Sequence, residues 1–217
     1  MTPLKAAALK PRKPARQQRA QATVEAILQA AARILAKDSL AGLNTNRVAE
    51  VAGISIGSLY QYFPNKEALI AALLLRAHTE QADALKKLAL ASRGQPLPVA
   101  VRALVKLALR GQWEQPRLSA ALDHEERRLP VDKLLRAAHQ AIDESLLDLL
   151  QDHRHAIAPG DLNVMARDVI DIAKALIEKD ADGRSEVPAG LEDRVYRAVM
   201  GYLVTPTEAN PQSSRRQ

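Results

Sequence analysis

Apolar residues recur at every third or fourth position through most of the chain, which is the spacing of an α-helix. Prolines at positions 64, 96, 98, 116, 130, 159, 188 and 206 separate these runs, because proline is disfavoured inside a helix and tolerated in its first turn. No run alternates in the manner of a strand, so the pattern predicts an all-α protein. The expected helices cover about 21–37, 46–52, 56–62, 66–91, 98–110, 117–128, 131–154, 161–179 and 190–204.

The second and third of these helices are joined by a turn of three to four residues that contains Gly53. Two short helices joined in this way form the helix-turn-helix motif, whose second helix enters the major groove of DNA. Thr45 and Ser55 are the expected N-caps. The small core of this unit is expected from Ile34, Val48, Val51, Ile54, Leu59 and Phe63.

Three of the six aromatic residues lie in the expected recognition helix or directly after it. Leu59 and Phe63 are four residues apart and share the inward face, whereas Tyr60 and Tyr62 lie further round the helix. A tyrosine hydroxyl can bind phosphate, and its ring can lie against sugar or a thymine methyl group. The small or apolar residues 56–58 begin the helix, where base edges are approached.

Lys66 follows in the first turn of the long helix expected at 66–91. A cation is mildly unfavourable at this end of a helix, unless a phosphate binds there and is contacted by both the lysine and the backbone amides. We therefore expect Lys66 to contact DNA. The alternative is a solvated lysine beside Glu67.

The net charge of +6 resides at one end of the 217-residue chain. Six basic residues and no acidic residue lie within the first 19 positions, so residues 20–217 are formally neutral. A basic arm favours an acidic polymer as partner, although a solvated tail is the alternative. The absence of cysteine fits a cytoplasmic protein, and no apolar run approaches the roughly 18 residues of a membrane span.

Three motifs in order resemble the tetracycline-repressor (TetR) family of bacterial transcription regulators. They read T-x-x-x-I-L-x-A-A at 23–31, G-L-N-T-N-R-V-A-E-x-A-G-I-S at 42–55 and G-S-L-Y-Q-Y-F-P-N-K-E-A-L at 57–69. One helix-turn-helix per chain, together with the apolar C-terminal helices, predicts a homodimer on a palindromic operator. The resemblance implies that a set of residues within 45–66 contacts this DNA. These are Thr45, Asn46, Arg47, Ser55, Ile56, Gly57, Ser58, Tyr60, Gln61, Tyr62 and Lys66.

The resemblance also implies a domain plan. We expect a disordered basic arm at 1–18, a DNA-binding domain at 19–65, an effector-binding and dimerisation domain at 66–205, and a disordered tail at 206–217. The apolar helices near 161–179 and 190–204 are expected to form the homodimer, and a monomer in which they pack internally is the alternative.

Polar residues that interrupt the middle helices are candidates for binding a small-molecule effector in a mostly apolar pocket. They are Trp113, His124, Glu125, Arg128 and His139. For each one, the alternative is an ordinary edge residue or a satisfied core residue. The expected function is a repressor that a small molecule releases from its operator.

Two other functions remain open from the sequence. One is a DNA-binding protein that bridges DNA to a partner without responding to a ligand. The other, an all-α enzyme, lacks support because the chain has no glycine-rich phosphate loop, no G-x-S-x-G and no H-E-x-x-H. His124, Glu125, Glu126 and His139 have only a weak resemblance to a metal site, so we expect no catalytic residue, metal or cofactor.

Overall fold

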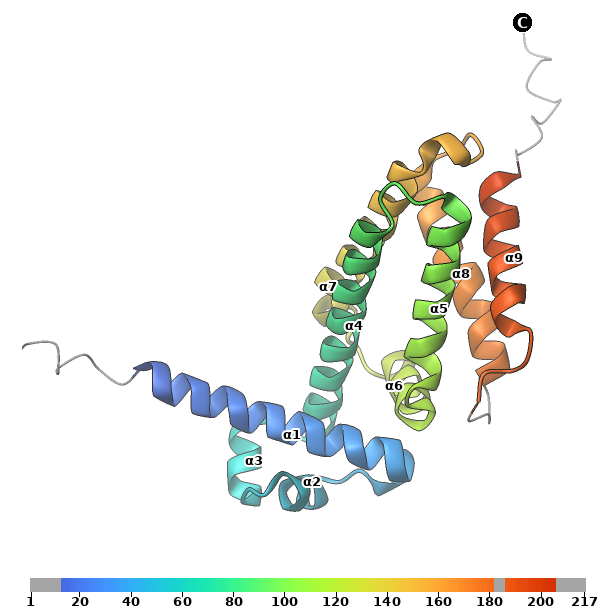
Figure 1. Ribbon diagram of the computed structural model, residues 1–217. Helices are drawn as coiled ribbons and strands as arrows, with labels where there is room; N and C mark the ends of the chain where they lie inside the picture. The colour runs from blue at the N-terminus through green and yellow to red at the C-terminus, as the bar shows by residue number, and fades with distance from the viewer. Residues whose placement is uncertain (1–12, 182–185, 206–217) are drawn as a thin grey trace, which may run out of the picture. The chain divides into compact units, whose positions relative to one another are not determined.

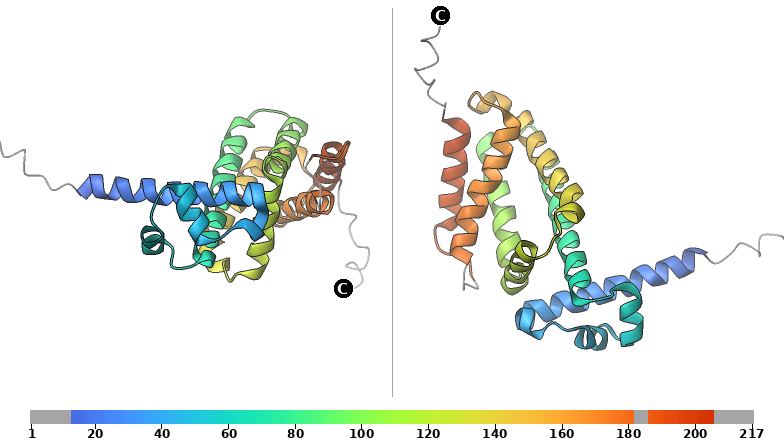
Figure 2. Two further views of the ribbon diagram at one scale, coloured as in Figure 1. Left: turned by 90° about the horizontal axis from the view of Figure 1, so that it is seen from below. Right: turned by 180° about the vertical axis from the view of Figure 1, so that it is seen from behind.

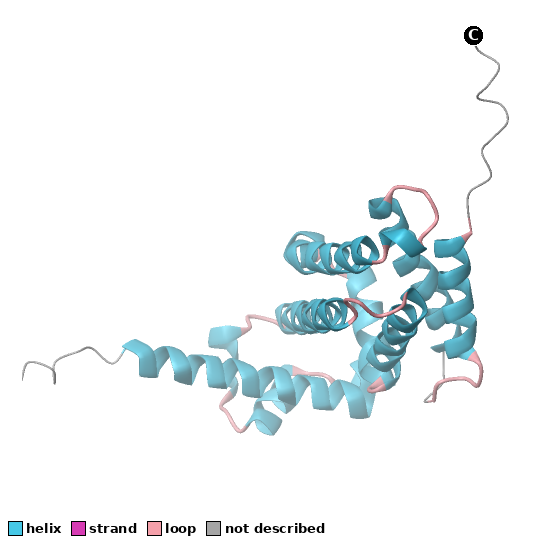
Figure 3. Ribbon diagram, turned by 45° about the horizontal axis from the view of Figure 1, so that its top comes forward, coloured by secondary structure: helices cyan, strands magenta, loops and turns pink. Residues whose placement is uncertain are grey.

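The computed structural model describes residues 13–181 and 186–205, with side chains from Arg19 onward. The described residues form helices and loops and contain no strand, which confirms the all-α prediction (Figures 1 and 3). The helices are α1 (Lys13–Gly42), α2 (Thr45–Ala52), α3 (Ile56–Tyr62), α4 (Lys66–Ala91), α5 (Leu97–Trp113), α6 (Pro116–Arg128), α7 (Asp132–Asp152), the 3₁₀ turn η2 (Arg154–Ala156), α8 (Leu162–Ala181) and α9 (Leu191–Val204).

The chain divides into two compact units, and the first ends at Ala72 within α4. In this first unit α2 packs against both α1 and α3. The side chain of Ser55 accepts a hydrogen bond from the Ser58 amide at 3.1 Å, which confirms Ser55 as the N-cap of α3. At α2 the N-cap is Asn44 rather than Thr45, because the Asn44 side chain accepts the Arg47 amide at 2.9 Å.

The turn between α2 and α3 depends on glycine. Gly53 has φ of 69°, in the left-handed region that other residues adopt at a cost, and its amide closes the end of α2. Gly42 is required for a different reason. A Cβ atom there would lie 2.4 Å from the Cβ of Asp38 on α1 and 3.0 Å from Nη1 of Arg47 on α2, so a larger residue would force these groups to shift.

The expected core of the first unit is correct except at Val51, which is 45% exposed. The buried pair of α2 is Val48 and Ala49. At about 100° per residue, Val51 points roughly 110° away from the middle of that pair. Ile54 is half-buried, while Ile34, Leu59 and Phe63 are buried as expected.

Helix α1 begins at Lys13, earlier than the expected position 21. Residues 13–18 of the predicted basic arm are therefore helical, and residues 1–12 lie outside the described part of the chain, as does the predicted tail at 206–217. The regular helix of α1 is interrupted at Ser39, which has φ of 57° and ψ of −165°.

The second unit begins at Leu73 and is a helical bundle with one apolar core. Helices α8 and α9 lie side by side (Figure 2), and α8 also packs against α5 and α7. The buried face of α9 repeats every four residues, through Leu191, Val195, Val199 and Leu203.

Polar contacts fix α9 to its neighbours. Arg102 on α5 lies 3.1 Å from Glu192 and 2.9 Å from Asp193, and its guanidinium lies over the Tyr196 ring at 4.0 Å. Nearer the end of α9, the Tyr202 hydroxyl donates to Asp168 on α8. Among the described residues, no helix is long and apolar enough to cross a membrane.

Candidate functional site

The outer face of α3 concentrates apolar and aromatic side chains that the fold leaves exposed. Ile56 and Tyr62 are each 36% exposed and Tyr60 is 49% exposed. The inward residue Leu59 is fully buried, so it holds the short helix against its unit. Gly57 is exposed, and a Cβ atom there would meet only the Ser55 side chain, at 3.9 Å. Close approach of another molecule to the start of α3 is therefore unobstructed.

Hydroxyl groups are paired on this same surface. Thr45 Oγ1 on α2 lies 3.1 Å from the Tyr60 hydroxyl on α3, and Ser55 Oγ lies 2.8 Å from Ser58 Oγ. Asn46 and Gln61 are exposed beside them. Besides Arg47, which is also on α2, nine of the eleven predicted DNA contacts lie on α2, α3 or the turn between them. They are Thr45, Asn46, Ser55, Ile56, Gly57, Ser58, Tyr60, Gln61 and Tyr62.

The two predicted cationic contacts are held by intramolecular bonds. The Arg47 guanidinium lies 2.5 Å from the Asp38 carboxylate and 3.4 Å from the Gly42 carbonyl, so it joins α2 to the end of α1. Lys66 is half-buried, and its Nζ donates to the Leu40 carbonyl at 3.3 Å. Lys66 is therefore not the fully solvated lysine that the sequence offered as an alternative. A DNA contact by Arg47 or by Lys66 stays a prediction.

The predicted effector residues of the second unit fall into different environments. Trp113 is 8% exposed, and its indole Nε1 is buried without a hydrogen-bond partner among the described residues. Glu125 is 6% exposed and is paired with Arg128, whose Nη2 lies 2.6 Å from its carboxylate. His124 is exposed on the same helix.

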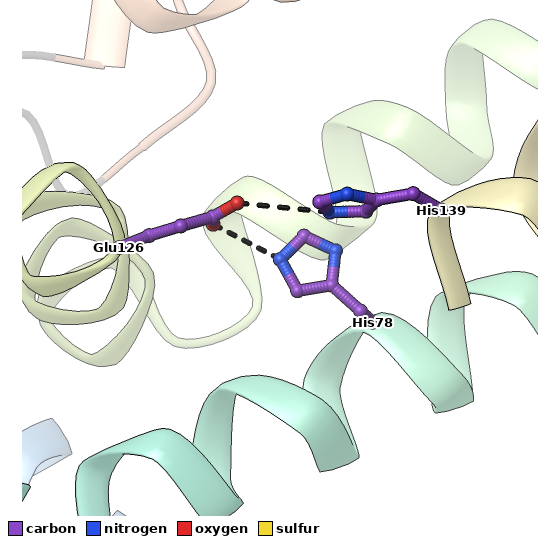
Figure 4. A group of neighbouring side chains, drawn as sticks. All are labelled: His78, Glu126 and His139. Carbon is purple, nitrogen blue, oxygen red and sulfur yellow. Dashed lines mark hydrogen bonds and ion pairs between the residues drawn. The ribbon is translucent and has the colours of Figure 1, made fainter. Parts of the chain in front are cut away.

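His139 instead joins a cluster with His78 and Glu126, which we call the His–Glu–His cluster (Figure 4). Its three residues come from α7, α4 and α6, respectively. His78 Nε2 lies 2.9 Å from Glu126 Oε2, and His139 Nε2 lies 3.7 Å from Glu126 Oε1. The two imidazole rings meet edge to face, with centroids 4.6 Å apart.

Protonation in the cluster follows from these contacts. The hydrogen bond with His78 lowers the pKa of Glu126, so its carboxylate is ionised at neutral pH. Burial, and secondarily the neighbouring His78, lower the pKa of His139. Because an ionised carboxylate only accepts hydrogen bonds, His78 Nε2 is the donor to Glu126. His78 Nδ1 is buried and has no partner among the described residues.

His78 is absent from the residues predicted from the sequence, although its place in the helical pattern is informative. Its neighbours four residues away on either side, Leu74 and Ala82, are both buried. A histidine on the apolar face of a helix is therefore visible in the sequence pattern. Its partners could not be identified in the same way, because they lie 48 and 61 positions further along the chain.

Two family models match the chain. The model of bacterial regulatory proteins of the tetR family matches residues 27–73. The model of the tetracyclin repressor-like C-terminal domain matches residues 96–203. The chain belongs to the TetR family. It is thus a helix-turn-helix, DNA-binding transcriptional regulator, and this family consists of transcription factors rather than enzymes.

Solved structures of two TetR regulators and of RolR share the fold of this chain. A TetR transcription regulator from Haloarcula marismortui ATCC 43049 has a TM-score of 0.68 at 18% identity, over 84% of this chain and 97% of that one. A TetR transcriptional regulator from Rhodococcus sp. RHA1 has a TM-score of 0.58 at 22% identity, over 86% and 98%. RolR in complex with resorcinol has a TM-score of 0.60 at 18% identity, over 87% and 90%. A search of curated proteins gives no match.

Proposed function

We propose that this TetR-family regulator is a homodimeric repressor of a palindromic operator, acts in the cytoplasm, and is released from DNA by a small molecule. The proposal of DNA binding rests on the outer face of α3. Ile56, Tyr60 and Tyr62 are exposed there beside Ser58 and Gly57. A single helix-turn-helix reads one half-site, so a palindrome calls for two copies of the chain.

Helices α8 and α9 support the dimer, because each retains apolar surface after packing in its own unit. Val164 on α8 is 49% exposed and Val204 on α9 is 44% exposed. Ile170, Leu176 and Met200 are only partly buried against the core. A second copy packed on these helices would remove that surface from water.

A buried donor in the second unit supports binding of an effector. Trp113 Nε1 is buried without a hydrogen-bond partner among the described residues, and leaving such a group unpaired costs about 1–3 kcal/mol. A ligand acceptor would satisfy it. The related RolR binds resorcinol, a small aromatic molecule with polar groups, and we propose a ligand of similar character here: small, largely apolar and able to hydrogen-bond.

Glu125 and Arg128 contribute less to this proposal than Trp113, because their charges are already paired with each other. His124 is exposed on α6. If these residues bind an effector, the pair must first separate, and breaking a partly buried ion pair opposes binding.

The test is a titration in two states. A compound that raises the melting temperature is titrated against free protein and against protein saturated with operator DNA. If the two sites are coupled, the compound lowers the affinity of the protein for DNA. DNA then lowers the affinity of the protein for the compound by the same factor. Equal affinity in both states would favour a protein that bridges DNA to a partner without a ligand response.

A further inference from the structure

Three helices that are separate in sequence bring two imidazoles and one carboxylate to a single point. In the His–Glu–His cluster, the candidate ligand atoms of His78, Glu126 and His139 all lie within 4.8 Å of one another (Figure 4). In a tetrahedral site with bonds of about 2.0–2.2 Å, ligand atoms lie roughly 3.3–3.5 Å apart. His78 Nε2 lies 2.9 Å from Glu126 Oε2 and His139 Nε2 lies 3.7 Å from Glu126 Oε1, so each imidazole is already near this separation from one of the two carboxylate oxygens. Small side-chain rotations would complete the geometry.

We propose that the His–Glu–His cluster binds a divalent transition-metal ion of the Zn²⁺ class through three protein ligands, leaving one coordination position open. Imidazole nitrogen with carboxylate oxygen is a ligand set of Zn²⁺, and three protein ligands plus one exchangeable position is an established arrangement for that ion. This differs from the sequence-based expectation of no metal. The sequence did not indicate this site because His78 and Glu126 are distant along the chain and become neighbours only in the fold.

Hard cations are poorer candidates for the same cluster. Ca²⁺ takes six to eight oxygen ligands, and Mg²⁺ prefers octahedral oxygen coordination. The cluster offers the two oxygens of one carboxylate, while its other two donors are nitrogens. We therefore expect selection for Zn²⁺, and for Co²⁺ as its spectroscopic substitute, over Mg²⁺.

The burial of the cluster suits an ion that enters from solvent. The side chains of His78 and Glu126 are 18% and 26% exposed, whereas that of His139 is 43% exposed. His139 therefore provides the open side. An ion bound at His78 Nε2 would replace the hydrogen bond between this nitrogen and Glu126, and the imidazole proton would move to Nδ1, which is buried without a partner among the described residues.

Binding is tested on the full chain without DNA, after treatment with a chelator and dialysis. Zn²⁺ and Co²⁺ are titrated by calorimetry into wild type and into His78→Gln, Glu126→Gln and His139→Gln. We expect one ion per chain and a loss of affinity on the order of 100-fold or more in each variant, because removing a second-shell partner alone typically costs 10–100-fold. His124→Gln is the matched control and should bind like wild type, because His124 is exposed and lies on α6 two residues before the cluster residue Glu126.

A second measurement locates the ion. Histidine ring signals in NMR spectra should shift on Zn²⁺ addition for His78 and His139, and stay in place for the exposed His124 and His155. Absence of stoichiometric binding by wild type would overturn the proposal, as would an equal loss in His124→Gln. The His139 side chain is the most exposed of the three. His139→Gln should therefore fold, and it tests the site even if the variants at His78 and Glu126 misfold.

This inference is independent of the proposed repression and release. Metal affinity is read from the protein alone, and operator binding is then measured with and without Zn²⁺. Metal binding without any change in operator affinity would support the metal site. The effector proposal is tested separately, by the titration described above.

Discussion

Thr45 and Tyr60 face each other from α2 and α3, with their hydroxyl oxygens 3.1 Å apart. Both are predicted DNA contacts, and we expect one phosphate oxygen to bind both hydroxyls. A hydroxyl can donate one hydrogen bond and accept others, so the pair can reorient when a phosphate arrives. The two helices of the motif would then bind the backbone as a unit.

Tyr60→Phe tests this arrangement by removing only the hydroxyl. Operator affinity should fall about fivefold, the equivalent of a hydrogen bond of roughly 1 kcal/mol. The melting temperature should change little, since Tyr60 is 49% exposed. Tyr196→Phe in the second unit is the control, and electrophoretic mobility shifts are the measurement. If Tyr60→Phe binds the operator with wild-type affinity, the Tyr60 hydroxyl does not contribute to DNA binding.

Lys66 can act on DNA, on the fold, or on both. Its Nζ lies 3.3 Å from the Leu40 carbonyl. If it also binds a phosphate, Lys66→Ala should weaken binding to all sequences alike and reduce the salt slope of log K by about 1. Lys66→Arg retains the charge and should preserve most of that slope. A lower melting temperature with an unchanged salt slope in Lys66→Ala would assign the residue to the fold alone.

Charge placed on the exposed apolar surface of α8 and α9 should separate the proposed dimer. Val164→Glu combined with Val204→Glu adds carboxylates where burial by a partner would make them costly. The dimer dissociation constant should rise at least about tenfold by analytical ultracentrifugation. Val99→Glu on α5 is the control, because Val99 is 51% exposed and lies on neither helix. An unaltered dimer in the double variant would place the interface elsewhere.

The Tyr202–Asp168 hydrogen bond predicts a loss of stability in alkali. This bond raises the pKa of Tyr202 to about 12, from an ordinary value of 10.0. The protonated phenol is therefore favoured in the folded state. Its contribution is complete below pH 10 and is lost as the pH rises from about 10 to about 12. Urea unfolding should show wild type about 1 kcal/mol more stable than Tyr202→Phe at pH 8, and the difference should shrink towards pH 12. A constant difference across this range would contradict the assignment.

The sequence predicted the helices well where proline and capping residues mark their ends. Helix α4 begins at Lys66 after Pro64, and α3 begins after its cap at Ser55, both as expected. The misassignment of the α2 cap, Thr45 for Asn44, is a shift of one residue between two good capping types. Val51 was misplaced because the two valines of an eight-residue helix do not define its buried face.

Contacts between helices were harder to foresee than the helices themselves. The pairing of Arg47 with Asp38 depends on the close approach of α1 and α2 at Gly42. The His–Glu–His cluster depends on how α4, α6 and α7 meet. Helical periodicity predicts that His78 faces inward, but the packing of the bundle decides which side chains it meets.

We propose that two copies of α3, one from each subunit of a dimer, read the DNA. The most direct test is hydroxyl-radical footprinting of wild-type protein on fragments selected from genomic DNA by binding. We expect two protected half-sites in palindromic order, separated by one helical turn of DNA or a multiple of it, and Ser58→Ala should alter the preferred bases within both. Protection of one half-site at full occupancy, or protection without sequence preference, would contradict this proposal.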